Sequence, residues 1–156
     1  DFDRDYMEAH GHGIYEPLDP NLLPPLYIAC RTDLSEISGV FHSNLRARWE
    51  QGDPAVIQAM ATFAELAEKG RDCLLRQDFQ TFGQLMDRGF DTRASICQLD
   101  PRNVAMIHLA RSFGVSATYA GSGGSIVGIC ESDEPFAKLQ EAFRQINCTI
   151  FRPRIV

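Results

Sequence analysis

In the sequence SATYAGSGGSIVGICESD, residues 116–133, two short segments with the pattern of β-strands flank Gly121, Ser122, Gly123 and Gly124. A tight β-hairpin needs only one or two turn residues of this kind. Because glycine has no Cβ, a run of glycines permits positive φ angles and lets other groups come close to the main chain. The surplus of glycine therefore predicts a turn whose backbone approaches something else.

Signals for the N-termini of helices recur along the rest of the chain. Asp53-Pro54 and Asp100-Pro101 each combine a capping carboxylate with proline at the first helical position. Gly70 either ends the helix that begins at Asp53 or lies within it. The predicted elements in chain order are a buried strand at 26–30, helices over 40–49, from Asp53, from Asp78 and from Asp100 to Gly114, strands at 116–120 and 125–131, a helix opened by Pro135, and a closing strand at 148–151.

Apolar residues at helical spacing give each of the longer helices an expected core face. The four faces are Val56, Ile57, Met60, Phe63, Ala64 and Ala67; Phe79, Phe82, Leu85, Met86 and Phe90; Val104, Ile107, Ala110 and Phe113; and Phe136, Leu139, Phe143 and Ile146. Residues 1–25 contain four prolines and are expected to be irregular.

The order strand, helices, strand, strand, helix, strand is that of a split βαβ plait, with the extra helices counted as one layer. We therefore expect an α+β fold of two layers, a ferredoxin-like plait whose four-stranded, mostly antiparallel sheet has helices packed on one face. Residues 26–30, 116–120 and 125–131 should be its central strands.

Composition excludes several functional classes. The chain has 156 residues, 44% hydrophobic and 23% charged, which is typical of a soluble globular domain. Its net charge is −6 and its arginines are scattered, so we expect no nucleic-acid partner. No apolar run approaches the roughly 18 residues of a membrane span, and no signal peptide is recognisable, so we expect no membrane partner.

Cysteine and histidine usage argues against disulfides and metal sites. The five cysteines are odd in number and form no CxxC pair, which favours free thiols in a reducing cytoplasm. His10 and His12 are close in sequence, but no second Cys/His pair completes a zinc set. We therefore expect a cytoplasmic protein and no metal site in this chain.

The glycine turn matches neither of the common phosphate loops. No Gly-Lys-Ser/Thr follows it, and Ile126 occupies the third glycine position of a dinucleotide fingerprint. Both of those loops also join a strand to a helix. Successive backbone N–H groups, with the hydroxyls of Ser122 and Ser125, are suited to form an anion-binding nest. The competing interpretation is a flexible hairpin without a ligand, and composition alone does not decide between the two.

Residues 117–125, ATYAGSGGS, resemble the third conserved motif of GHMP kinases, the superfamily of galactokinase, homoserine kinase and mevalonate kinase. Residues 11–17 and 23–27 resemble the glucuronokinase branch, as do the residues around Ser38-Gly39, Arg46 and Arg48-Trp49, and Phe90-Asp91 with Arg93. The similarity runs over nearly the whole chain and over the C-terminal half of such a kinase. Two positions depart from the motif: Ala120 stands where Thr or Ser is usual, and the common upstream lysine is replaced.

This resemblance implies a C-terminal plait domain at 26–156, entered by a segment at 1–25 from an N-terminal domain of the same polypeptide. The N-terminal domain would carry the main ATP phosphate loop and the usual catalytic base, so we assign no catalytic residue and no metal ligand here. The full enzyme would use ATP and Mg²⁺ to phosphorylate the anomeric hydroxyl of a small sugar substrate, glucuronic acid. Residues 1–156 alone should lack sugar kinase activity.

The resemblance also implies which residues line the cleft. The phosphate-side loop is Gly121, Ser122, Gly123, Gly124 and Ser125. A uronic acid carries a carboxylate, which favours an arginine partner with its fork of donors. The candidates on the substrate side are Arg93 first, then Asp91, Arg46, His12 and Tyr15, with Arg48 also considered. For each arginine the alternative is a surface ion pair, and for His12 and Tyr15 it is a packed linker.

A second function class remains open from sequence alone. A plait with a glycine turn also occurs as a non-catalytic ligand-binding or regulatory domain. An upstream extension with a glycine-serine phosphate loop would favour the kinase, and a natural start at Asp1 would favour the regulatory domain.

Overall fold

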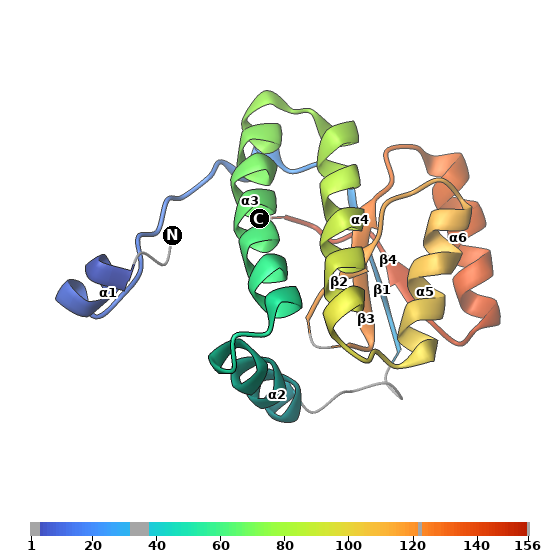
Figure 1. Ribbon diagram of the computed structural model, residues 1–156. Helices are drawn as coiled ribbons and strands as arrows, with labels where there is room; N and C mark the ends of the chain where they lie inside the picture. Colours follow the sequence, from blue (N-terminus) through green and yellow to red (C-terminus); the bar gives the residue numbers. More distant parts are fainter. Residues whose placement is uncertain (1–3, 32–37, 122, 156) are drawn as a thin grey trace.

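The computed structural model describes residues 4–31, 38–121 and 123–155. The chain folds into a sheet, a helical layer and an extended N-terminal segment (Figure 1). The elements are α1 (Arg4–His10), the 3₁₀ turn η1 (Pro20–Leu22), β1 (Leu26–Cys30), α2 (Ser38–Glu50), α3 (Pro54–Arg76), α4 (Phe79–Ile96), α5 (Pro101–Ser112), β2 (Thr118–Tyr119), β3 (Ser125–Ile129), α6 (Asp133–Gln145) and β4 (Thr149–Phe151).

The sheet has the strand order β2-β3-β1-β4, and all three pairings are antiparallel. This is the topology of a ferredoxin-like plait, so the expected fold class is confirmed. One expectation about the sheet is wrong, because β1 and β3 form its centre and residues 116–120 do not. The strand there has only two residues, Thr118 and Tyr119, and lies at the edge.

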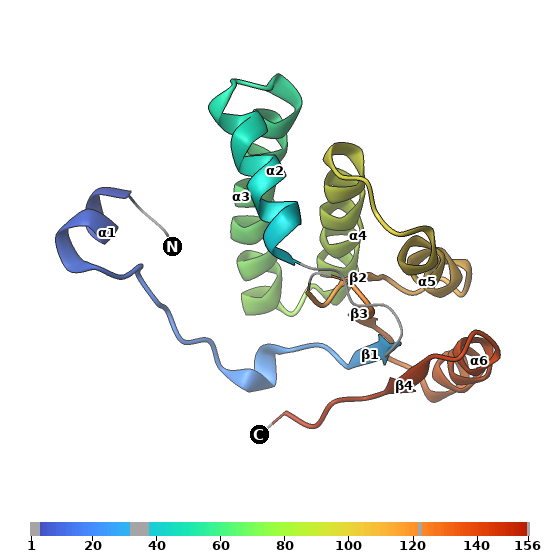
Figure 2. The ribbon, with the colours of Figure 1, turned by 90° about the horizontal axis from the view of Figure 1, so that it is seen from below.

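Helices α4, α5 and α6 lie on one face of the sheet, while α3 packs on α4 and α2 packs on α3 (Figure 2). The alternation of side chains across β1 explains this arrangement, since Tyr27 and Ala29 are buried while their neighbours are only partly covered. Leu139 and Phe143 of α6 and Met106 of α5 are fully buried in the same cluster. This single core fixes the sheet against α4, α5 and α6.

The aspartate signals at the helix starts are confirmed. Asp53 accepts a hydrogen bond from the Ala55 N–H, and Asp100 accepts one from the Arg102 N–H, at 2.9 and 2.8 Å. Each is followed by proline in the first turn, and Asp78 caps α4. Helix α3 runs through Gly70 rather than ending there.

The expected core faces are only partly correct. On α3, Ile57 and Met60 are 45% and 37% exposed, while the small residues Ala59 and Gly70 are buried. On α5 the buried face consists of Asn103, Met106, Ile107 and Ala110, and Phe113 lies outside it. Periodicity identifies an apolar stripe, but it does not state which stripe meets this sheet and which meets another surface.

The N-terminal segment is not wholly irregular, because α1 forms over Arg4–His10. Its last turn is supported by the His10 ring, which stacks on Tyr6 and lies 2.9 Å from the Tyr6 carbonyl oxygen. Further along, Arg71 of α3 binds the Glu16 carboxylate through two donors, which holds the segment on the helical layer. The boundary at residue 25 stays a prediction.

All five cysteines are free thiols, three of them buried. Within the described part of the chain, no helix is both long enough and apolar enough to span a bilayer.

Candidate functional site

The glycine turn joins the edge strand β2 to the central strand β3. Its base is closed by the Ala120 N–H, which donates to the Ser125 carbonyl oxygen at 3.0 Å. Gly123 and Gly124 have φ angles of 147° and 76°, which are left-handed conformations that favour glycine. Gly121 has an ordinary φ, and Ser122, named in the predicted loop, lies outside the described residues.

The turn is held from three directions. The Gly124 N–H donates to Asn103 Oδ1 of α5 at 2.9 Å, and its carbonyl accepts from the Arg31 N–H at 2.8 Å. Arg93 at the end of α4 donates to the Gly121 carbonyl at 3.1 Å, with its guanidinium 5.0 Å from the centre of the Tyr119 ring. These contacts oppose the interpretation of a flexible hairpin, because each fixes one part of the turn to a different element.

Three arginines lie at or next to the turn, but in the described part of the chain only Arg93 has its guanidinium in observed contact with it. Arg31 and Arg93 contact the turn directly, and Arg102 precedes the Asn103 that binds it. Arg102 also pairs with Asp100 at 2.7 Å, and its side chain and N–H, with a smaller contribution from Arg31, lower the pKa of Asp100 to about 2. Guanidinium groups and the N-terminal turn of α5 both favour a phosphate or carboxylate ligand.

Of the residues predicted to bind the substrate, Arg93 contacts the turn. Asp91 pairs with Arg111 at 2.7 Å, and Arg46 pairs with Glu50 on the exposed side of α2. Arg48 binds Asp53, as a structural ion pair between α2 and the start of α3.

His12 and Tyr15 lie on the N-terminal segment, which runs along the far side of α3 from the hairpin (Figure 1). Tyr15 is 75% exposed, and His12 Nδ1 lies 2.9 Å from the Gly13 carbonyl oxygen. The described structure therefore does not bring these two residues to the turn.

Two residues at the turn were not predicted from the sequence, Arg31 and Asn103. Arg31 directly follows β1, whose last residue Cys30 pairs with Ser125 at the start of β3. That register becomes visible only when the strand order is known. Asn103 did carry a signal, because it lies three residues before Met106 on the buried face of α5.

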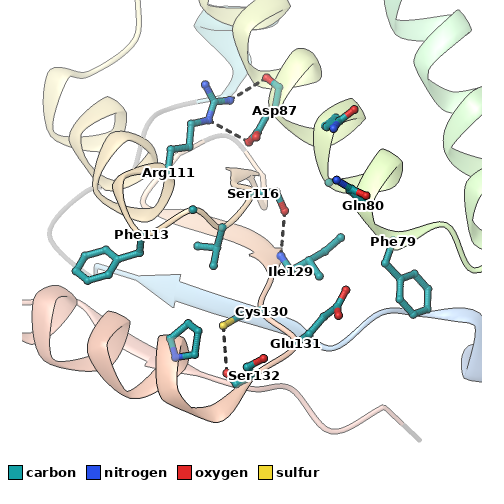
Figure 3. A pocket seen from close by; sticks show the side chains of 15 residues that line it. Phe79, Gln80, Asp87, Arg111, Phe113, Ser116, Ile129, Cys130, Glu131 and Ser132 are labelled. Carbon is teal, nitrogen blue, oxygen red and sulfur yellow. Dashed lines mark hydrogen bonds and ion pairs between the residues drawn. The ribbon is translucent and has the colours of Figure 1, made fainter.

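The opposite end of the sheet carries a cavity of about 720 Å³ (Figure 3). Its walls come from the starts of α4 and α6 and the ends of α5 and β3, and Gln80, Glu131 and Ser132 are among its polar lining residues. Residues 126–128 of β3 separate Ile129 of the cavity wall from Ser125 of the turn, a distance on the order of 13 Å. None of the sequence candidates lines this cavity, so the two are separate features.

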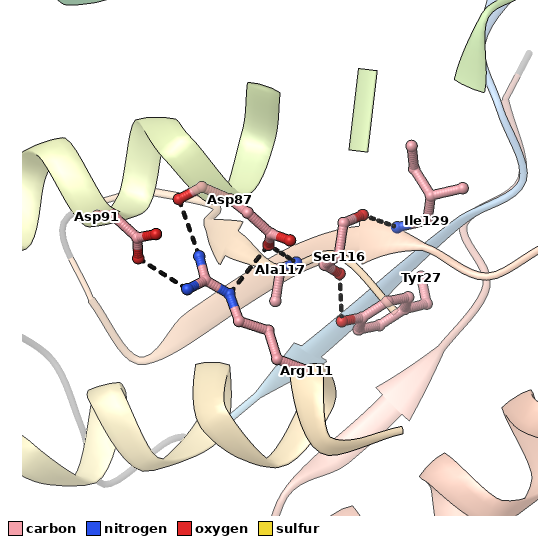
Figure 4. A network of polar contacts seen from close by, with 7 residues as sticks. All are labelled: Tyr27, Asp87, Asp91, Arg111, Ser116, Ala117 and Ile129. Carbon is pink, nitrogen blue, oxygen red and sulfur yellow. Dashed lines mark hydrogen bonds and ion pairs between the residues drawn. The ribbon is translucent and has the colours of Figure 1, made fainter. Parts of the chain in front are cut away.

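A polar network fixes the hairpin at this opposite end (Figure 4). Asp87 of α4 accepts hydrogen bonds from Arg111 at 3.0 Å and from the Ala117 N–H at 2.9 Å. Arg111 also donates to Asp91 at 2.7 Å, so Asp91 belongs to this structural network.

A close contact between β1 and the hairpin completes the network. The Tyr27 hydroxyl donates to the Ser116 carbonyl oxygen at 2.9 Å, and burial raises the pKa of Tyr27 above its ordinary value. The Ser116 hydroxyl accepts from the Ile129 N–H at 3.2 Å. Tyr27 passes directly over Gly128, where an added Cβ would lie 2.6 Å from a ring carbon of the tyrosine.

Residues 4–31, 38–121 and 123–155 contain no group of three His, Cys, Asp or Glu side chains able to hold a metal ion.

The family model described as "GHMP kinases C terminal" matches residues 71–148, half of the chain, including Arg93, Asn103 and the complete glycine turn. The chain belongs to the GHMP kinase family. Probable glucuronokinase 2 of Arabidopsis thaliana is 41% identical over 145 residues, which cover 90% of this chain and 39% of that protein. Glucuronokinase 1 of Arabidopsis thaliana is 39% identical over 155 residues, covering 96% of this chain and 42% of that protein.

Solved structures give the same fold. The crystal structure of L. major mevalonate kinase in complex with R-mevalonate has a TM-score of 0.72 at 17% identity, covering 83% of this chain and 42% of that one. A protein from Listeria innocua has a TM-score of 0.73 at 12% identity, covering 83% and 38%. The GHMP chain described here therefore spans about two fifths of the length of the curated relatives and of these structures.

Proposed function

We propose that this chain is the C-terminal part of an ATP-dependent GHMP-family kinase that phosphorylates a sugar acid, glucuronate, at its anomeric hydroxyl. The observation that carries the proposal is the glycine turn anchored by the Arg31 N–H, the Asn103 side chain and the Arg93 guanidinium. The two Arabidopsis relatives named as glucuronokinases support the choice of substrate. Membership of a kinase family disfavours the alternative of a non-catalytic regulatory domain.

In this proposal the turn lies against the phosphoryl group in transfer. Catalysis of phosphoryl transfer consists mainly of positioning and charge stabilisation, and backbone N–H donors held in fixed directions contribute to both. The loop Gly121, Ser122, Gly123, Gly124 and Ser125 would supply these donors and two hydroxyls, except that the Gly124 N–H is already used by Asn103. The nearby arginines would offset the charge of the phosphates.

Arg93 is our first candidate for the substrate carboxylate, because its guanidinium already lies at the turn. Arg46, Asp91, His12 and Tyr15 stay as secondary candidates on the acceptor side. Arg46 pairs with Glu50 and Asp91 with Arg111. His12 contacts Gly13 and the Tyr6 ring, and Tyr15 is exposed.

The remaining parts of the active site would come from the preceding N-terminal domain of the same polypeptide. The described residues offer arginines and glycine backbone to ATP phosphates but no carboxylate cluster to Mg²⁺. Mg²⁺ bound to ATP neutralises phosphate charge during transfer. By the family resemblance, we place the metal ligands and the catalytic base in that domain. The free cysteines favour the cytoplasm as the location of the whole protein.

The test is phosphorylation by the full-length protein. With ATP and Mg²⁺, ³¹P NMR should detect glucuronate 1-phosphate, and glucose, which lacks the carboxylate, should be used about 100-fold less efficiently. Arg93→Lys keeps the charge but loses the planar fork, so KM for glucuronate should rise about 10-fold. Residues 1–156 alone should be inactive. A full-length protein that phosphorylates no sugar acid, or a 156-residue chain that does so efficiently, would refute the proposal.

A further inference from the structure

Asn103 is the one buried polar residue in the described part of the chain, and it is 1% exposed. It lies in the first turn of α5 on the same face as Met106 and Ile107, where an apolar residue would be expected. A buried amide that lacks a partner costs about 1–3 kcal/mol. Its presence in the core therefore calls for a specific contact.

That contact is the glycine turn. Asn103 Oδ1 accepts a hydrogen bond from the Gly124 N–H at 2.9 Å, and the Gly124 carbonyl accepts from the Arg31 N–H at 2.8 Å. Gly124, with a φ of 76°, is thus held on one side by α5 and on the other by the end of β1. Glycine by itself has a wide choice of backbone conformations, and these two hydrogen bonds select one of them.

We infer that Asn103 is a positioning residue that fixes Gly123 and Gly124 in the conformation that meets the transferring phosphate. The inference rests on the proposed kinase function. In this inference Asn103 acts by holding the Gly124 N–H and not by contact with the phosphate. Displacement by about 1 Å of groups that orient a reacting centre is enough to lower turnover by roughly 100-fold.

A purely structural role predicts something different. If Asn103 served only to satisfy a buried N–H, its loss would lower the fraction of folded protein and leave turnover per folded molecule unchanged. The chain offers a matched control, because the Ser116 hydroxyl accepts the Ile129 N–H at the opposite end of the same hairpin. Ser116→Ala removes the same kind of hydrogen bond without affecting the turn.

The experiment compares Asn103→Leu, Asn103→Asp and Ser116→Ala in the full-length protein. Two quantities are measured: amide hydrogen exchange over residues 118–126 in the absence of substrate, and kcat and KM with ATP and glucuronate. Leu is similar in size and has no acceptor, whereas Asp keeps an acceptor oxygen at the same place.

We expect Asn103→Leu to exchange at least about 10-fold faster at the turn, with kcat per folded molecule at least about 10-fold lower and the KM for glucuronate within about 3-fold. Asn103→Asp should recover exchange protection and part of kcat. Ser116→Ala should keep kcat. Should Asn103→Leu leave no folded protein, Asn103→Ala gives the same two comparisons.

Unchanged exchange at the turn in the variant without an acceptor, or unchanged kcat per folded molecule, would overturn the inference. An equal loss of kcat in Ser116→Ala would also overturn it, since the effect would then be general destabilisation. Wild-type turnover tests the proposed function separately, and exchange at the turn is read without any substrate.

Discussion

The two ends of the β2–β3 hairpin use glycine for opposite reasons. At one end Gly128 lies beneath Tyr27, and an added Cβ would overlap the Ser116 carbonyl oxygen and the tyrosine ring. At the other end, apart from Gly121 and its two chain neighbours, no heavy atom of the described residues lies within 4 Å of a Cβ added to Gly121. The first glycine is explained by packing inside this domain, and the second is not. This difference directs attention to what lies outside the domain at the turn.

The largest effect we predict is at the packed end. Gly128→Ala should destabilise the full-length protein by about 3 kcal/mol or more, because neither the Ser116 backbone nor the buried Tyr27 ring has room to move. A thermal melt measures this. The control is Gly89→Ala on α4, where the added Cβ meets Leu66 at an ordinary 3.9 Å and alanine favours the helix. Equal melting temperatures for the two variants would contradict the claim that packing against Tyr27 and Ser116 requires glycine at position 128.

The next prediction separates backbone strain from function. Gly124 and Gly52 both have a φ of 76°, but Gly52 lies between α2 and α3. Alanine at either position should cost on the order of 1 kcal/mol in stability. Only Gly124→Ala should also lower kcat per folded molecule, by about 10-fold, because it alone disturbs the phosphate turn. A similar kcat in both variants would mean that the left-handed glycine of the turn has no functional role.

The smallest effect concerns the cap of α5, beside the turn. Arg102 lowers the pKa of Asp100 from 3.8 to about 2, so the charged carboxylate is favoured in the folded protein. This stability is present above pH 4 and is lost as the pH falls from about 4 to 2. Asp100→Asn should flatten that part of the stability curve and have little effect near neutral pH, because asparagine also caps helices well. Chemical denaturation at several pH values measures it, and an unchanged slope below pH 4 would contradict the assignment.

Much of the fold was accessible from the sequence because its signals are local. Asp-Pro pairs mark the starts of α3 and α5, and the plait follows from the order of elements. The length and edge position of β2 could not be predicted from the sequence, because they depend on its pairing with β3. The exposure of Ile57 and Met60 was also missed, since an apolar stripe has the same pattern whether it faces this core or another surface.

The site divides in the same way. The glycine turn and Arg93 were predicted from residues and motifs, and the structure brings them together. Arg31, directly after β1, and Asn103 of α5 are distant in sequence from the turn and reach it through contacts that only tertiary structure creates. A buried asparagine on an apolar helix face is the signal that would have identified one of them.

The central claim is that the turn is glycine-rich because a ligand lies against it. Gly121→Val in the full-length protein tests this most directly, because Gly121 has an ordinary φ and open space around it within this domain. The account predicts a folded protein, with a melting temperature within about 2 °C of wild type, whose turnover per folded molecule falls by roughly 100-fold. Wild-type turnover in a folded Gly121→Val protein would contradict it.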